Sequence, residues 1–200
     1  LATDNDFQVN VHAIGDRANQ IVLEILQSLH KEQDQKPYRH RIEHAQVLTL
    51  DDIERFPSLN LIASMQPVHA TSDKNMAGDR LGEQRLEGAY AWRKFLDQGT
   101  RLASGSDFPV EPVNPLFGIH AAVTRRDRQG QPEKGWRVKE AMTMEEALRS
   151  FTLDAAYASH QEQVTGSLEP GKFADFILLD RNIFTNDPQQ IWQAQVLETW

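Results

Sequence analysis

The chain alternates four times between a short β-type segment and a longer stretch rich in helix-forming residues. The β-type segments cover residues 7–14, 38–47, 59–67 and 100–112, and a helical stretch follows each of them. Strands that alternate with helices form a parallel sheet with right-handed crossovers. The pattern therefore predicts an α/β fold, with four β-α units that make half of a (β/α)8 barrel or a small open sheet.

Capping residues mark the starts of two predicted helices. Asp16 can cap a helix over residues 17–33, which carry apolar side chains at helical spacing. Thr49, with Asp52 three residues further on, can cap a short helix over residues 50–56. These two helices complete the first two β-α units.

The third strand is followed by polar residues that indicate a loop, and a helix is expected from about residue 80 to residue 98. Gly99 is the predicted stop of that helix. The fourth unit contains a strongly patterned helix over residues 142–160, where Thr143 and Glu146 have the spacing of a capping box. The region between the third and fourth strands is thus predicted as a loop and then one helix.

Residues 161–200 differ in character from the rest of the chain. Residues 166–180 hold a Pro-Gly turn followed by a strand rich in Phe, Ile and Leu, and a loop around Pro188 comes next. We interpret this segment as a β element separate from the four β-α units.

Composition excludes several classes of function. The formal net charge of -8 argues against a surface for nucleic acid or for an anionic membrane, so a small-molecule partner is expected. No apolar stretch of about eighteen residues is present that could span a membrane. The chain has no cysteine, so any metal must be held by imidazole and carboxylate groups.

Two histidines and one aspartate lie at or just beyond the ends of different predicted strands. They are His12, His44 and Asp107. Functional groups gather at the carboxyl ends of strands in barrels and open α/β sheets. Two imidazoles and a carboxylate suit a hydrolytic zinc site without cysteine. A lone histidine near a strand end is as often a hydrogen-bonded structural residue, so the prediction depends on all three together.

Several motifs along nearly the whole chain occur in the same order as in a known family. They are VHAIGDRA, RIEHAQ, ASMQPVH, YAWRKFLDQGTRLASGSDFPVEPVNPL, EEALRSFTLDAAYA and GSLEPGKFADFILLDR. In these motifs the chain resembles the amidohydrolase superfamily, and closely its amidohydrolase-3 branch, which includes N-substituted formamide deformylase and YtcJ-like hydrolases.

The resemblance implies a role for each candidate residue. In the superfamily one histidine follows the fifth strand, one the sixth and one aspartate the eighth, which correspond to His12, His44 and Asp107 here. The histidines would bind a divalent metal, with one or two zinc ions expected, and Asp107 would bind the metal or its water and transfer protons. His69, in the predicted loop after the third strand, would face the active site and bind substrate or stabilise an oxyanion.

The resemblance also implies partners outside this chain. The superfamily's His-x-His pair and its bridging carboxylate or carbamylated lysine have no counterpart here and are expected upstream of Leu1, together with any targeting signal. Residues 1–160 would be the C-terminal half of a (β/α)8 barrel, and residues 161–200 the C-terminal segment of a composite β-sandwich. We therefore expect a homo-oligomer or association with an N-terminal half, and the cytoplasm is the favoured location.

The predicted activity is metal-dependent hydrolysis, through an activated water, of a carbon–nitrogen bond other than a peptide bond. The substrate would contain an amide, N-acyl or cyclic amide group. Two alternatives stay open: an incomplete fragment that only oligomerises or packs with its other half, and a hydrolytic deaminase of the same superfamily.

A competing motif lies around the second strand. Residues 40–44, HRIEH, match the H-x-x-E-H signature of inverted zinc proteases, which needs both histidines on one face of a helix. The alternation of residue types favours a strand instead, on which His40, Ile42 and His44 share one face.

Overall fold

The computed structural model describes residues 2–32 and 38–200, and the chain forms two compact units. The first unit comprises residues 1–65 and 75–103, and the second comprises residues 66–74 and 104–200. Each unit buries apolar side chains of its own. The predicted end of the first helix, at Gln33, lies outside the described residues.

A four-stranded sheet in the order β1-β2-β3-β4 organises the first unit. β1 pairs with β2, and β2 with β3, in parallel, which confirms the α/β fold with a parallel sheet. Each strand lies inside its predicted segment and is shorter than that segment. The strands are β1 (Asn10–Ala13), β2 (Arg41–His44), β3 (Ile62–Met65) and β4 (Arg101–Ser104).

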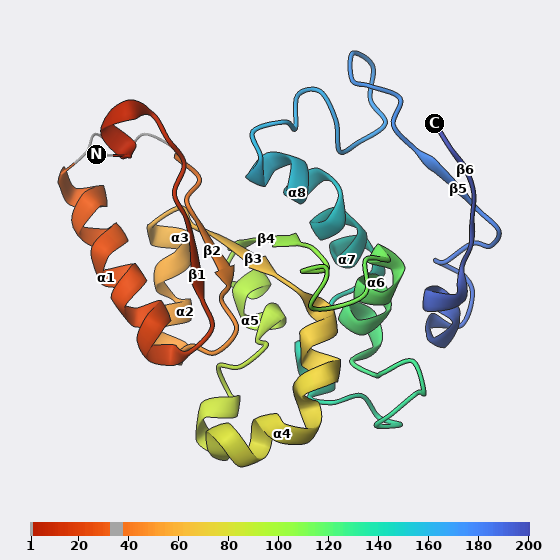
Figure 1. Ribbon diagram of the computed structural model, residues 1–200, viewed down its shortest axis with the longest axis horizontal. Coiled ribbons are helices and arrows are strands. Elements are labelled where there is room, and N and C mark those ends of the chain that lie inside the picture. The colour runs from red at the N-terminus through yellow and green to blue at the C-terminus, as the bar shows by residue number, and fades with distance from the viewer. Residues whose placement is uncertain (1, 33–37) are drawn as a thin grey trace. The chain divides into compact units, whose positions relative to one another are not determined.

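Helices of the first unit lie beside this sheet (Figure 1). Helix α1 contacts β1, and its Leu23 is fully buried. Phe56 of α3 meets Phe95 of α5 edge to face, with 4.8 Å between ring centroids. The predicted cap of α2 is confirmed, because the Thr49 hydroxyl accepts a hydrogen bond from the backbone N–H of Asp52 at 3.1 Å. The bounds are α1 (Asp16–Glu32), α2 (Leu50–Ile53), α3 (Arg55–Ser58), α5 (Trp92–Asp97) and a 3-10 helix (Thr3–Asn5).

The segment after β3 is helical, so the loop predicted there is wrong. Helix α4 (Pro67–Leu86) starts directly after the strand, with Pro67 as its first residue. Proline favours this first position because its fixed φ suits a helix and its missing N–H is not needed there. Most of the polar residues that suggested a loop are only half-buried or exposed on the helix. His69 therefore lies in the first turn of α4 and not in a loop.

The single helix predicted over residues 80–98 is also wrong. The helical dihedrals of α4 already break at Gly82, where φ is 70° and ψ is 159°. Beyond Leu86 the chain forms a β-bridge between Ala89 and Val47, and α5 starts only after it. A contact distant in sequence thus divides a segment whose local pattern suits one helix.

The second unit contains a helix that is not among those predicted from the sequence. Helix α6 (Pro115–Thr124) begins after Asn114, whose side chain accepts a hydrogen bond from the backbone N–H of Leu116 at 3.0 Å. Asparagine as the cap followed by proline at the first helical position is a start signal that could have revealed it.

The patterned segment over residues 142–160 divides at Thr152 into α7 (Met144–Phe151) and α8 (Leu153–Ala158). The capping box of Thr143 with Glu146 is confirmed in both of its hydrogen bonds. No helix among the described residues has both the length and the apolar character needed to cross a membrane.

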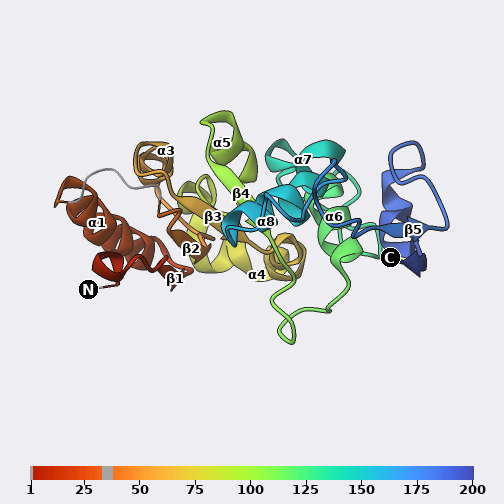
Figure 2. The ribbon, with the colours of Figure 1, turned by 90° about the horizontal axis from the view of Figure 1, so that it is seen from above.

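The C-terminal part of the second unit carries a two-stranded antiparallel sheet (Figure 2). β5 (Ile177–Leu179) pairs with β6 (Val196–Thr199), and the 3-10 helix between them (Pro188–Gln193) packs on α6. Another 3-10 helix covers Val138–Glu140. The β-type character predicted after residue 160 is thus present, while the domain boundary at that point stays a prediction.

Gly118 sets how closely α6 and α7 pack. A methyl group at Gly118 would collide with the ring of Phe151, whereas one at Gly78 in α4 would meet nothing within 4 Å. We predict that Gly118→Ala lowers the free energy of unfolding by about 1–3 kcal/mol through overpacking. Gly78→Ala should raise it by about 0.4–1 kcal/mol, because alanine restricts the unfolded chain. Urea denaturation measures both changes, and a stabilising Gly118→Ala would contradict the close packing of the two helices.

His120 is a buried histidine on α6 with only 1% of its surface exposed. Burial lowers the pKa of His120 from 6.5 to about 4, and the positive charges of Arg126 and Arg128 act in the same direction. A hydrogen bond with Gln189 and the charge of Asp127 oppose this shift without cancelling it. His120 is therefore neutral at neutral pH.

We predict that His120 makes the protein less stable as the pH falls. The pKa of His120 is about 4 in the folded protein and 6.5 as its ordinary value, so unfolding takes up a proton between these values. The free energy of unfolding should therefore drop as the pH falls from 6.5 towards 4, with no contribution above that range. Urea denaturation at about pH 7 and about pH 5 should show a smaller drop for His120→Gln than for the parent. An equal drop in both proteins would contradict the lowered pKa.

Candidate metal centre

Two of the predicted ligands, His12 and His44, lie side by side in the first unit. His12 is part of β1 and His44 ends β2, and the parallel register sets Ala13 opposite His44. The centroids of the two imidazole rings are 4.6 Å apart, at an interplanar angle of 74°. His12 is exposed, whereas His44 is buried. Strand pairing thus brings together two nitrogen donors, one of which solvent can reach.

The backbone is strained at two of the three predicted ligands. His44 has φ 74° and its neighbour Ala45 has φ 43°, and Asp107 has φ 59°. These values lie in the left-handed region, which costs a residue other than glycine on the order of 1–3 kcal/mol and which clusters at functional sites. The strain is an independent structural reason to look for function at these residues.

Asn19 ties together the loops that follow the two histidine-bearing strands. Its side chain is fully buried, at 0% exposure, near the start of α1. The amide group donates to the carbonyl oxygens of Ala13 at the end of β1, of Ile14 and Gly15 just after it, and of Val47 after β2, over 2.9–3.2 Å. Its two protons are shared among these four acceptors. One side chain therefore fixes the ends of both strands relative to each other.

His40, the first histidine of the HRIEH motif, has a different role. Residues 41–44 form a strand, so the helical zinc-protease geometry is absent from this segment. The Nδ1 atom of His40 accepts a hydrogen bond from the backbone N–H of Val9 at 3.0 Å, and burial lowers the pKa of His40. His40 thus acts as a neutral acceptor that holds the chain leading into β1.

The second unit brings His69 and Asp107 together. The Nε2 atom of His69 lies 3.5 Å from the Oδ2 atom of Asp107. His69 is buried in the first turn of α4, and the side chain of Asp107 is 34% exposed. The carbonyl of Asp107 accepts a hydrogen bond from the backbone N–H of Val110 at 2.8 Å, which closes a turn after β4. A carboxylate and an imidazole at this distance can hold a cation jointly or pass a proton.

Each unit therefore contributes one pair of candidate residues. The sequence predicts His69 to bind substrate or an oxyanion but does not predict its place beside Asp107. Pro67 is the signal that could have indicated it, because a helix that starts there keeps His69 near the end of β3. Imidazole and carboxylate donors at the ends of parallel strands, without cysteine, are typical of metal-dependent hydrolases.

A family model agrees with this class of protein. The model of the amidohydrolase family (Amidohydro_3) matches residues 1–200. The chain belongs to the amidohydrolase family.

Relatives and solved structures point the same way. YtcJ of Bacillus subtilis (strain 168), a candidate amidohydrolase by name, is 33% identical over 99% of the chain and 37% of its own length. N-substituted formamide deformylase of Arthrobacter pascens is 29% identical over 95% of the chain and 34% of its own length. An uncharacterised metal-dependent hydrolase of Pyrococcus horikoshii OT3 superimposes with a TM-score of 0.78 at 30% identity, over 94% of the chain and 36% of that protein. The chain spans about a third of the length of the curated relatives it matches.

Substitution of Asn19 tests whether it positions the histidine pair. We predict that Asn19→Ala lowers the free energy of unfolding by about 1–3 kcal/mol, because buried carbonyl groups lose a donor. Asn19→Asp should cost more, since its carboxylate would face the same carbonyl oxygens. Both variants should also bind zinc more weakly, as measured by titration, because the two loops lose their common tie.

Gln20→Ala is the matched control for this prediction. Gln20 is the next residue of α1, and its side chain contacts Arg17 at the surface. Its replacement should change the free energy of unfolding by less than about 0.5 kcal/mol and leave the zinc titration unaltered. Equal effects of Asn19→Ala and Gln20→Ala would refute the positioning role of Asn19.

Proposed function

We propose that the chain belongs to a metal-dependent amidohydrolase that cleaves amide, N-acyl or cyclic amide bonds other than peptide bonds. The observation that carries this proposal is the His12–His44 pair, two imidazoles at the ends of adjacent parallel strands in a chain matched throughout by the amidohydrolase family model. The name of one relative, N-substituted formamide deformylase, describes a bond of this kind.

The donors in this chain suit a divalent metal. Among the described residues the His12 side chain has no hydrogen-bond partner, which leaves its ring nitrogens available to an ion. In the proposal His12, His44 and Asp107 bind the metal, with zinc preferred for nitrogen and oxygen donors of this type. When bound, the ion would polarise the scissile carbonyl and make water more acidic.

Asp107 is proposed to move the proton. Its carboxylate takes a proton from the attacking water and delivers it to the leaving nitrogen, first as general base and then as general acid. Its partial exposure leaves it accessible to water and substrate. His69, 3.5 Å away, orients this carboxylate and can donate a hydrogen bond to the oxyanion that develops on the carbonyl.

The proposal extends to the architecture. Residues 1–160 would form half of a (β/α)8 barrel, and residues 161–200 part of a β-sandwich. The short length relative to the matched proteins and the open four-stranded sheet support this view. The partner would be the remaining barrel half or a second copy of the chain, and the small-molecule substrate would bind at the strand ends.

Three substitutions test the proposed metal site. We predict that Asp107→Asn keeps the fold but lowers the rate of amide hydrolysis by about 10² to 10⁴, because the proton acceptor is lost. His12→Ala and His44→Ala should instead lower the bound metal. Metal content is measured by mass spectrometry of the purified protein, and hydrolysis by release of amine.

His160→Asn serves as a control, since His160 is exposed and has φ 57°, a value that asparagine tolerates. It should alter neither metal content nor rate. Full metal occupancy and near-normal turnover in all three site variants would remove the proposed function.

A further inference from the structure

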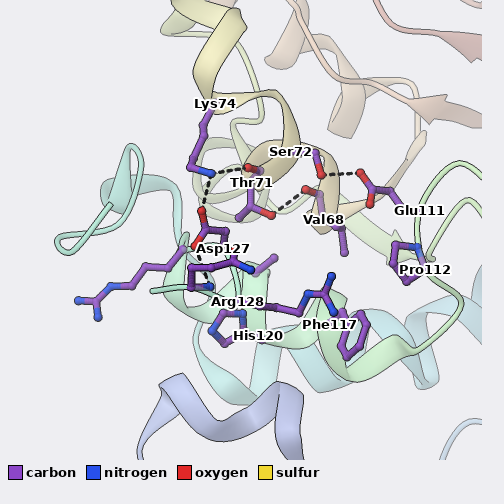
Figure 3. A pocket seen from close by; sticks show the side chains of 13 residues that line it. Val68, Thr71, Ser72, Lys74, Glu111, Pro112, Phe117, His120, Asp127 and Arg128 are labelled. Atoms are coloured by element: carbon purple, nitrogen blue, oxygen red, sulfur yellow. Dashed lines mark hydrogen bonds and ion pairs between the residues drawn. The ribbon is translucent and has the colours of Figure 1, made fainter. Parts of the chain in front are cut away.

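The second unit contains a pocket of about 260 Å³ that none of the proposed catalytic residues lines (Figure 3). It is formed by the first turns of α4, the loop after β4, helix α6 and the loop after α6. Val68 and Thr71, which line it, flank His69 on α4. Glu111, at another wall, donates its backbone N–H to the carbonyl of Asp107 at 3.4 Å. The pocket thus adjoins the His69–Asp107 pair within one unit.

One ion pair in the pocket is already satisfied. The ammonium of Lys74 lies 2.7 Å from the carboxylate of Asp127 and donates to the carbonyl of Thr71 at 3.0 Å (Figure 3). Burial would raise the pKa of Asp127, but the hydrogen bonds from Lys74 and from the backbone of Gln131 and Gln129 outweigh it and lower that pKa. The charges of Lys74 and Asp127 neutralise each other, so neither is left to attract a charged ligand.

Two arginines at the pocket have no such partner. In the part of the chain that the structure describes, neither Arg126 nor Arg128 forms an ion pair. The guanidinium of Arg128 lies 4.5 Å from the centroid of the Phe117 ring (Figure 3). It lies 5.9 Å from the centroid of the Trp192 ring. Acidic residues outnumber lysine and arginine, 29 to 21, in this chain. Two unpaired guanidinium groups in one pocket of an acidic protein indicate an anionic ligand.

The opposite wall is acidic. The carboxylate of Glu111 accepts a hydrogen bond from the hydroxyl of Ser72 at 2.6 Å (Figure 3). Its charge disfavours a second negative group on the ligand. The apolar ring of Phe117 also lines the pocket and suits a planar or aliphatic part of the ligand.

We infer that this pocket binds the carboxylate end of the substrate, with Arg128 as the partner of the carboxylate. The substrates are then small amides or N-acyl compounds that carry one carboxylate. The inference that the bound carboxylate belongs to the substrate rests on the proposed function. The inference that the pocket binds a small carboxylate is independent of that function. Planar carboxylate and planar guanidinium match as a bidentate pair, which a neutral amide of the same shape cannot form.

Benzoate and benzamide are matched probes, because they differ in charge but hardly in size. Calorimetric titration of the full protein should show binding of benzoate and little binding of benzamide. Arg128→Gln should weaken benzoate binding by about tenfold to a hundredfold. Arg80→Gln, at an exposed site on α4 outside the pocket, should leave it unchanged. Glu111→Gln removes a negative charge and should leave benzoate binding as tight or tighter.

Hydrolysis separates this inference from the proposed function. The metal-loaded protein should release benzoate faster from N-benzoylglycine than from N-benzoylglycinamide, and Arg128→Gln should abolish this preference. One outcome would be hydrolysis with no preference for N-benzoylglycine, together with benzoate binding that is unaffected by Arg128→Gln. This outcome would refute the carboxylate site in the pocket but would be consistent with the proposed hydrolase function. Benzoate binding that depends on Arg128, with no hydrolysis of any amide, would support carboxylate binding in the pocket and refute the proposed hydrolase function.

Discussion

In a parallel sheet all strands end at the same edge, so side chains at those ends become neighbours whatever their separation along the chain. Here β1 and β2 pair with Ala13 opposite His44, and the two imidazole rings come within 4.6 Å of each other. The arrangement depends on register, because a shift by one residue would turn His44 to the other face of the sheet. The buried amide of Asn19 is a second constraint on this arrangement, since it donates hydrogen bonds to the segments that follow both strands. The chemistry of the first unit is therefore a consequence of strand pairing more than of any single loop.

Strained backbone at the strand ends fits this view. A left-handed conformation at His44 and at Asp107 persists only where surrounding contacts hold it. After β2 such a contact is the hydrogen bond from the N–H of Val47 to the carbonyl of Ile14 at 2.9 Å, and after β4 it is the turn closed by Val110 at 2.8 Å. Each strained residue thus sits in a segment fixed by a backbone hydrogen bond from a residue three positions further on. The left-handed conformation at these residues costs stability, and it sets the direction in which the chain continues after each strand.

Features that depend on local pattern could be predicted from the sequence, and features that depend on distant contacts could not. The parallel sheet follows from alternating strands and helices, and the Thr143 cap follows from a spacing of three residues. The place of α5 depends on the bridge between Ala89 and Val47, which no local pattern encodes. His69 was misplaced because a half-exposed helix rich in polar residues resembles a loop in composition, although Pro67 marked its start. The role of Asn19 could not be predicted because its four acceptors come from two segments that are distant in sequence, the end of β1 with the loop after it and the loop after β2.

The aromatic setting of Arg128 bears on how an acidic protein can bind an anion. A net charge of -8 repels anions at long range, so the attraction must come from groups close to the ligand. A free arginine side chain loses about 2 kcal/mol of rotamer entropy when it is held in place. Contact with Phe117 and Trp192 restricts Arg128 before any ligand arrives, and stacking leaves the hydrogen-bond donors at the edge of the guanidinium plane available. Much of the entropy cost of ordering Arg128 is thus met on folding. A single exposed arginine can therefore discriminate a carboxylate from an amide of equal shape.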